Sequence, residues 1–375
     1  MQSAPLSDIK AGNVKSGAQL TFKVSNRNCL QPMRAQCLYR HFINFNTVSL
    51  LLVLCVLYLL RANGSVPLQR FEYAQIHMGV KVRIVMYSED EPSAETACIA
   101  AFKRIAQLED IFSDYRPRSE LMRLCANAGG APVKVSDELF AVLEYAQRIS
   151  ELTDGAFDVT VGPLSTLWRN ARKLGQLPPE QEMQKALRKV GWHKMRLDAI
   201  SKTVQLLEPG MLLDLGGIAK GYTLDRAIEV LRQHGIHRAL IEAGGDIVTG
   251  DPPPNEDGWK IELAYARDSG DSLDGDRKCR RIIKIANAAI ATSGDTEQFI
   301  DIGGVRYSHI VDPRIGIVPA KEIVATVVAS EGITADALAT VLYMFGDIER
   351  FKSVVMRGRF KVINAYLFSV RGVVK

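Results

Sequence analysis

Cysteine is scarce in this chain, which has only six among its 375 residues. If an N-terminal segment is removed, as argued below, only the widely separated Cys98, Cys125 and Cys279 remain. Small secreted domains that depend on disulfides carry an even number of cysteines at closer spacings. The chain therefore has no disulfide framework, and its 47% of hydrophobic residues is enough for an ordinary buried core.

The excess of positive charge in the chain is also small. The net charge is only +5, and much of the excess lies near the N-terminus. No stretch combines basic with aromatic residues, so the sequence gives no reason to expect nucleic-acid binding. Repeats, low-complexity tracts and sharp breaks in composition are missing too. We therefore expect a single α+β domain that starts near residue 68.

Long hydrophobic runs are limited to one segment near the N-terminus. The apolar stretch 48–60 is shorter than the about 20 residues that a membrane-spanning helix needs. Basic residues precede this stretch, and the small residues Ala62 and Gly64 follow it at the spacing of a cleavage site. We interpret 42–64 as a signal peptide or membrane anchor, preceded by an extension, 1–41, without an assigned fold. A buried core helix is the alternative.

This interpretation predicts where the protein works. A basic region followed by an apolar core is typical of an export signal. We expect the domain to be exported to the periplasmic side of the cytoplasmic membrane, where it is either anchored or secreted.

Hydrophobic periodicity predicts the outer elements of the domain. Alternation over 71–87 predicts a β-hairpin that turns at Met78-Gly79. We expect helices, the first of them ended by Pro117, over 93–112, 137–151, 180–190 and 334–345. We also expect strands near 281–292 and 305–311, with a surface excursion over 251–278.

The centre of the chain has a βαβ-like order. A strand over 211–215, a glycine turn over 216–221, a helix over 222–234 and a strand over 238–247 follow one another. Glycines between a strand and a helix let the backbone approach a phosphate, and Lys220 adds a positive charge there. A structural turn without a ligand fits these residues equally well, because neither the spacing of a Walker loop nor that of a dinucleotide fingerprint is met.

Two other groups of residues are candidates for chemistry. Asp336 and Thr340 lie four residues apart, so a helix would place their oxygen atoms on one face, as ligands suited to magnesium. The alternative is that Asp336 only complements the helix dipole. His309, ahead of the turn Asp312-Pro313, is the histidine best placed for proton transfer, although an isolated histidine is usually structural.

Several ordered motifs resemble the ApbE family of flavin transferases. They are LDLGGIAKGYTLDRAIEVL (213–231), IEAGGDI (241–247), ATSGD (291–295), SHIVDPRIG (308–316) and TADALAT (334–340), with shorter matches at 78–79, 113–121 and 154–164. The similarity predicts an ApbE-like domain over 68–350. The tail 351–375 matches the family only loosely.

The resemblance implies a magnesium-dependent enzyme whose substrate is FAD. Such an enzyme cleaves FAD, attaches FMN through a phosphoester to a threonine hydroxyl of an acceptor flavoprotein, as in membrane redox complexes, and releases AMP. His309 and Asp336 would be catalytic, although a carboxylate could take the hydroxyl proton instead of His309. The positions that match metal ligands are Gly217, through its carbonyl, Asp336 and Thr340. The positions that match FAD contacts are Met78, Tyr115, Ala156, Phe157, Asp158, Asp214, Lys220, His309 and Ile310.

Departures from the family pattern leave two other functions open. Val80 and Ile315 stand where the family often has threonine, and Ala339 stands where some members carry a second aspartate. A weakened metal site would favour a non-catalytic flavin carrier or maturation factor. An FAD pyrophosphatase that releases FMN and AMP to water would use the same residues as the transferase.

Overall fold

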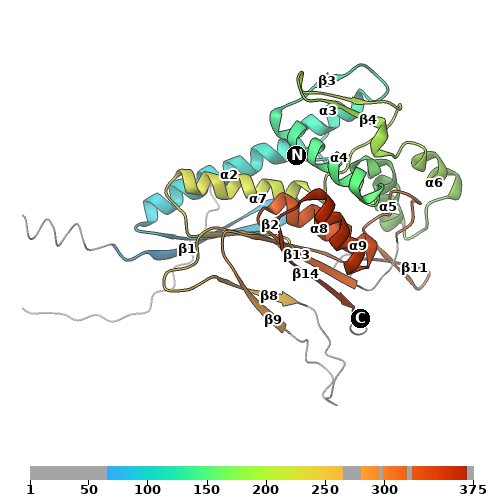
Figure 1. Cartoon of the computed structure of the whole chain (residues 1–375). Helices are drawn as coiled ribbons and strands as arrows, with labels where there is room; N and C mark the ends of the chain where they lie inside the picture. Colours follow the sequence, from blue (N-terminus) through green and yellow to red (C-terminus); the bar gives the residue numbers. More distant parts are fainter. Residues whose placement is uncertain (1–65, 265–279, 295–298, 319–322, 370–375) are drawn as a thin grey trace, which may run out of the picture. The chain divides into compact units, whose positions relative to one another are not determined.

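The computed structural model describes residues 66–264, 280–294, 299–318 and 323–369. Its centre is a seven-stranded sheet, shown in Figure 1. In spatial order, the strands are β1 (Gln69–His77), β2 (Val80–Ser88), β6 (Ala239–Ala243), β7 (Asp246–Thr249), β10 (Ala289–Gly294), β13 (Ile323–Ala329) and β14 (Val362–Ser369). The predicted α+β class is confirmed.

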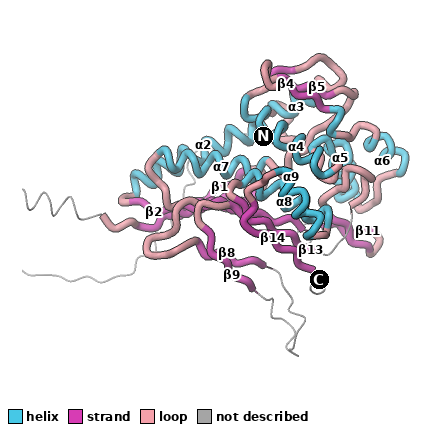
Figure 2. The backbone as a smooth tube through the Cα atoms, in the orientation of Figure 1, coloured by secondary structure: helices cyan, strands magenta, loops and turns pink. Residues whose placement is uncertain are grey.

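Helices cover one face of this sheet, and a β-hairpin lies against the other (Figures 1 and 2). The covering helices are α2 (Glu91–Phe112), α4 (Asp137–Thr153), α7 (Ala219–Gln233), α8 (Gly332–Phe345) and α9 (Ile348–Gly358). The hairpin consists of β8 (Trp259–Ala264) and β9 (Arg280–Ile285). Ile241 of β6 packs toward the helices, whereas its neighbour Leu240 packs toward the hairpin. Because both faces are covered, all seven residues of β13 are buried.

Smaller elements surround the central sheet. A three-stranded sheet contains β3 (Val133–Lys134), β5 (Thr203–Leu206) and β4 (Met195–Asp198), and a second hairpin contains β11 (Phe299–Ile302) and β12 (Val305–Ser308). The remaining helical elements are α3 (Glu120–Ala126), η1 (Val159–Val161), α5 (Gly162–Leu174), α6 (Glu180–Leu187) and η2 (Trp192–Lys194). No helix among the described residues is both long and apolar enough to cross a membrane.

Local signals in the sequence located most of the outer elements. The hairpin of β1 and β2 turns at Met78 and Gly79, both with positive φ (51° and 74°). The predicted helices are present as α2, α4, α6 and α8. Pro117, however, does not end α2. The helix ends at Phe112, where the backbone N–H of Ser113 donates to Glu109 O. The Ser113 side chain accepts from Tyr115 N and Arg116 N.

The predicted strand at 211–215 is wrong. The apolar segment MLLDL predicted a strand, and Met211, Leu213 and Leu215 are buried, yet the segment pairs with no strand. Its backbone N–H groups bond elsewhere: Leu213 N donates to Cys125 Sγ (3.3 Å) and Asp214 N donates to Val159 O (2.8 Å). The predicted βαβ-like order of residues 211–247 therefore lacks its first strand.

Other strand predictions also need correction. The expected strand 238–247 is a hairpin, β6 and β7, because Gly244 and Gly245 both adopt positive φ (57° and 93°). The expected strand near 281–292 is likewise two strands, β9 and β10. The tail contributes α9 and the edge strand β14, which pairs with β13. The predicted signal segment, 42–64, and residues 265–278, the second half of the predicted excursion, lie outside the described residues.

Helices α7 and α8 cross at two glycines. A Cβ atom added to Gly221 would lie 2.1 Å from Gly332 O, and one added to Gly332 would lie 2.4 Å from Gly221 O. Each helix also supplies a carboxylate to the other. Asp336 accepts from Gly221 N (3.0 Å), while Asp225 accepts from the first two N–H groups of α8 (2.6 and 2.9 Å). The crossing therefore requires glycine at both positions.

We predict that Gly221→Ala destabilises the protein. Alanine is the better helix former by about 1 kcal/mol, but its methyl group would overlap the α8 backbone, and overpacking of this kind costs about 1–3 kcal/mol. Chemical denaturation measures the change. Glu229→Ala on the exposed side of the same helix is the control, expected to change stability by less than about 0.5 kcal/mol. Equal midpoints for the two variants would contradict the close crossing.

Candidate active site

The predicted site residues line one cavity of about 860 Å³. Its walls come from the β1–β2 turn, the loop after α2, helix α5, the glycine turn before α7, strand β10, the segment after β12, and α8. The predicted residues among its lining are Met78, Tyr115, Ala156, Phe157, Asp158, Asp214, Gly217, Lys220, His309, Ile310, Asp336 and Thr340. The fold thus gathers residues that are up to 262 positions apart in the chain (340 − 78). Which of them touch a ligand stays a prediction.

Oxygen atoms of α8 meet the glycine turn in this cavity. Asp336 and Thr340 lie one helical turn apart, as their spacing predicts. A Cβ atom on Gly217 would lie 3.1 Å from Thr340 Oγ1, so the turn runs directly beside this hydroxyl. Ser293 Oγ of β10 lies 3.2 Å from the same oxygen. The cavity wall here therefore consists of a carboxylate, hydroxyls and exposed backbone.

Lys220 links two buried carboxylates. Its ammonium forms an ion pair with Asp246 of β7 and lies 3.8 Å from Asp336 Oδ1. Burial alone would lower the pKa of Lys220, but the two carboxylates raise it above its ordinary value. Burial raises the pKa of Asp336 to about 7, although Lys220 opposes this shift. The lysine is therefore a fixed positive charge beside the glycine turn.

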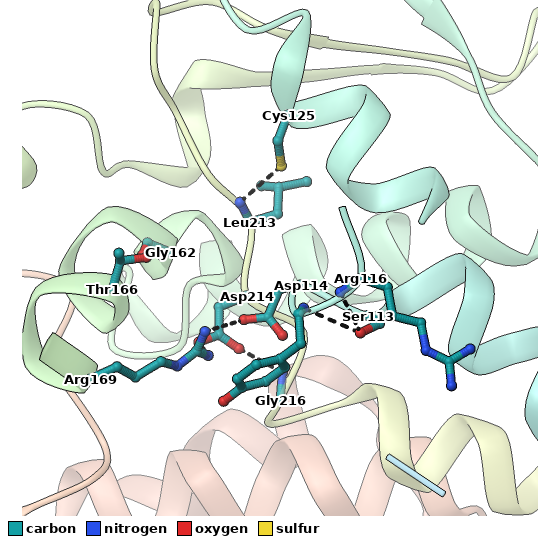
Figure 3. A network of polar contacts seen from close by, with 11 residues as sticks. Ser113, Asp114, Arg116, Cys125, Gly162, Thr166, Arg169, Leu213, Asp214 and Gly216 are labelled. Atoms are coloured by element: carbon teal, nitrogen blue, oxygen red, sulfur yellow. Dashed lines mark hydrogen bonds and ion pairs between the residues drawn. The ribbon is translucent and has the colours of Figure 1, made fainter. Parts of the chain in front are cut away.

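Arg169 of α5 connects two further carboxylates, as Figure 3 shows. Its Nη1 pairs with Asp114, and its Nη2 donates to Asp214 Oδ2 (2.8 Å). Asp214 Oδ1 accepts from Gly216 N (2.9 Å), which ties the carboxylate to the glycine turn. The guanidinium carbon also lies 4.6 Å from the centre of the Tyr115 ring. Burial, and then Asp214, raise the pKa of Asp114, while Arg169 opposes both.

The segment 156–158 contributes buried side chains. Phe157 is only 5% exposed, so it packs under the glycine turn and offers little surface to a ligand. Asp158 Oδ1 accepts from Thr160 N (2.8 Å) and Thr160 Oγ1 (2.7 Å), which starts η1. Burial raises the pKa of Asp158 against these hydrogen bonds. In this structure Asp158 has the geometry of a turn-forming residue.

The turn after His309 is rigidly held. Ile310 N donates to Ser308 Oγ (3.1 Å), and the Asp312 carboxylate accepts from Arg314 N (3.0 Å), Nε (2.9 Å) and Nη2 (2.7 Å). Trp168 Nε1 of α5 donates to Gly316 O (2.9 Å). His309 itself is exposed and lines the cavity. The backbone beside His309 is therefore held, and His309 is exposed at the cavity wall.

A comparison with protein families assigns the chain to a known family. The sequence model of the ApbE family matches residues 78–363, which include every residue placed in the cavity above. The chain belongs to the ApbE family. It is an enzyme, a transferase.

Two similar proteins and a solved structure agree with this assignment. The FAD:protein FMN transferase of Klebsiella pneumoniae is 32% identical over 74% of this chain and 83% of its own length. The FAD:protein FMN transferase of Treponema pallidum is 31% identical over 76% of this chain and 81% of its own length. The flavin transferase ApbE from Vibrio cholerae, 28% identical, superimposes with a TM-score of 0.68 over 81% of this chain and 98% of that one.

The donor set of this ApbE chain fits magnesium. Mg²⁺ prefers hard oxygen ligands, keeps several waters, and uses one or two carboxylates together with substrate phosphates. Asp336 and Thr340 offer such oxygens one helical turn apart, and Gly217, whose carbonyl is the third predicted donor, lies beside Thr340 Oγ1. Within the part of the chain that the structure describes, no three His, Cys, Asp or Glu residues gather as an all-protein metal cage.

The departures from the ApbE pattern leave these donors unchanged. Ala339 is completely buried in the core between the helices and the sheet, and it does not line the cavity. Ile315 is 55% exposed, beside the glycine that Trp168 binds. Val80 lines the cavity next to Gly244. The alanine therefore gives no structural reason to expect a weakened metal site.

The charged residues of the ApbE cavity wall that sequence reasoning missed include Asp114 and Arg169. Asp114 stood inside a quoted motif but was not singled out, and Arg169 belongs to α5, a helix that was not predicted. The apolar spacing of Leu164, Trp168 and Ala171 was the available signal for this helix. No local pattern indicates that Arg169 reaches a loop 55 residues earlier in the chain.

Proposed function

We propose that this transferase is a magnesium-dependent FAD:protein FMN transferase that modifies a threonine of an acceptor flavoprotein. The observation that carries the proposal is the convergence, in one cavity, of hard oxygen donors, the Lys220 ammonium and the exposed Tyr115 ring. A dinucleotide with a charged pyrophosphate and a flat ring needs these features. The names of the relatives support the same donor and the same kind of acceptor.

The reaction exchanges a phosphoanhydride bond for a phosphoester bond. The threonine Oγ of the acceptor attacks the phosphorus on the FMN side of the pyrophosphate, and the bond from that phosphorus to the bridging oxygen breaks. FMN becomes attached to the acceptor, and AMP leaves with the bridging oxygen. Asp336, Thr340 and Gly217 O would hold Mg²⁺, which neutralises charge on the phosphate oxygens when bound.

This chain supplies the other elements of the reaction. Lys220 adds a fixed positive charge at the turn where the phosphates would lie. His309, exposed at the cavity wall, would take the proton from the attacking hydroxyl. Tyr115 offers an aromatic surface for a ring of the dinucleotide, since 74% of the residue is exposed.

We predict that Asp336→Ala abolishes transfer while FAD binding is largely kept, because ring and backbone contacts do not require the metal. The protein is incubated with FAD, Mg²⁺ and a flavoprotein carrying the acceptor threonine, and the acceptor is weighed by mass spectrometry. Loss of several kcal/mol of charge stabilisation lowers the rate about tenfold per 1.4 kcal/mol. Asp257→Ala, at an exposed carboxylate outside the cavity lining, is the control.

Three results of this assay count against the proposal. Activity of Asp336→Ala within about threefold of wild type at saturating Mg²⁺ would place the metal elsewhere. Release of free FMN and AMP with no mass added to the acceptor would indicate a pyrophosphatase. Bound FAD that stays intact with Mg²⁺ and acceptor would indicate a flavin carrier.

His309 gives a separate prediction. If its ring accepts the hydroxyl proton, His309→Asn should lower the transfer rate by roughly 10²–10⁴-fold and leave FAD affinity nearly unchanged. The wild-type rate should rise with pH through an imidazole titration, because only the neutral ring accepts a proton. Rates measured against pH for both proteins, with exposed His237→Asn as control, test this role. A pH limb that persists in His309→Asn would assign the proton to another group.

We also propose that the domain acts outside the cytoplasm, on a flavoprotein of a membrane redox complex. The support is the basic region and apolar run ahead of the domain, because basic residues tend to stay on the cytoplasmic side. A C-terminal reporter that is active only in the cytoplasm should be silent on the whole chain. The same fusion without residues 1–65 should be bright. A bright reporter on the whole chain would overturn the localisation.

A further inference from the structure

Arg169 has no role in the reaction described above, yet it touches two residues of the predicted flavin site. It lies on α5, whereas Tyr115 lies in the loop after α2 and Asp214 in the segment before α7. One guanidinium therefore joins three parts of the cavity wall (Figure 3). Its side chain is 34% exposed, and the two carboxylates that it binds are 17% and 15% exposed.

We propose that Arg169 is a positioning residue that holds the Tyr115 ring ready to stack on the flavin ring of FAD. This inference rests on the proposed function, because it takes FAD as the ligand of the cavity. It names a residue that the reaction itself does not require.

The contacts of Tyr115 are divided between its backbone and its ring. Ser113 Oγ accepts from Tyr115 N (3.2 Å), which fixes the backbone of the loop. The ring has Arg169 over one face, at 4.6 Å from its centre, while 74% of the residue remains exposed. A guanidinium over an aromatic face is attractive and leaves the opposite face free. Arg169 thus orients the ring without covering the surface that a ligand would use.

The two carboxylates fix the guanidinium in turn. Asp114 and Asp214 each bind one of its terminal nitrogens, so its plane cannot rotate freely. Asp214 is also held by Gly216 N (2.9 Å), at the start of the turn that leads to Gly217. Without Arg169, the two carboxylates would face each other unpaired and repel. Loss of the arginine should therefore loosen the Tyr115 ring, whereas Asp214 keeps the turn through its hydrogen bond with Gly216 N.

Flavin fluorescence tests the proposal, since stacking against tyrosine quenches the emission of the flavin ring. FAD and FMN are each titrated with wild type, Arg169→Met and Arg169→Lys. For Arg169→Met we expect about 10-fold weaker binding of both ligands and less quenching in the bound state. The transfer rate at saturating FAD should stay within about threefold of wild type. Arg169→Lys, which keeps the charge but not the flat group, should lie between the two.

A double-mutant cycle shows whether Arg169 acts through Tyr115. In a Tyr115→Leu background, Arg169→Met should weaken FAD binding by less than about twofold, because the ring that it positions is gone. The matched control is Arg226→Met, which removes an arginine that lies 5.2 Å over Tyr222 and pairs with Glu229 (2.9 Å) outside the cavity lining. Arg226→Met should lower the thermal unfolding midpoint about as much as Arg169→Met does, and it should leave flavin affinity and quenching unchanged.

Several results would overturn the inference. One is unchanged flavin affinity and quenching in Arg169→Met, and another is a loss of FAD affinity of about 10-fold on Arg169→Met that persists in the Tyr115→Leu background. An equal loss of flavin affinity in Arg226→Met would also count against it, as would an Arg169→Met protein that binds FAD more weakly but FMN as well as wild type. A wild-type protein that binds FAD but transfers nothing would overturn the proposed function alone, since the titrations would still report on Arg169. A wild-type protein that binds neither flavin would overturn both.

Discussion

The cavity depends on a contact between the backbones of two helices. Where α7 and α8 cross, Asp336 accepts from Gly221 and Asp225 accepts from the start of α8. Because neither glycine of the crossing can carry a side chain, the helices come close enough for residues on both to share one wall. Lys220 immediately precedes one glycine, and Asp336 and Thr340 follow the other within three helical turns. The relative position of the ammonium, the carboxylate and the hydroxyl therefore follows from the crossing.

Besides this helix crossing, the site contains two cationic side chains that are each shared by two carboxylates. Lys220 lies between Asp246 and Asp336, and Arg169 lies between Asp114 and Asp214. In each cluster two carboxylates share one cation. The cation therefore offsets only part of the cost of burying two negative charges, and the pKa of Asp336 and of Asp114 is raised. An anionic ligand that enters meets cations already bound to carboxylates. A divalent ion beside Asp336 would add positive charge to this wall and so favour binding of a phosphate.

The sequence predicted those parts of the site that depend on short spacings. Asp336 and Thr340 lie on one helical face because four residues make about one turn, and the hairpin at Met78 follows from alternation and a glycine. Residues 211–215 were misread, because alternating burial also occurs in an extended segment whose N–H groups bond a thiol and a loop carbonyl. Arg169 could not be predicted, since its partners lie on segments that only the complete fold brings together. Periodicity could predict neither the family nor which residues meet in one cavity. Both predictions came from the ordered motifs.

The strands occupy the central sheet in the same order as they occur in the chain, from β1 at one edge to β14 at the other. No strand has to insert between two that are already paired, so a nascent chain can extend the sheet one strand at a time during synthesis. Until β14 emerges, however, β13 presents an open edge formed by the apolar sequence IVATVVA. Such an edge is a template for pairing with other chains. Ribosome stalling or premature termination before residue 362 would therefore yield an aggregation-prone fragment and not a smaller working domain.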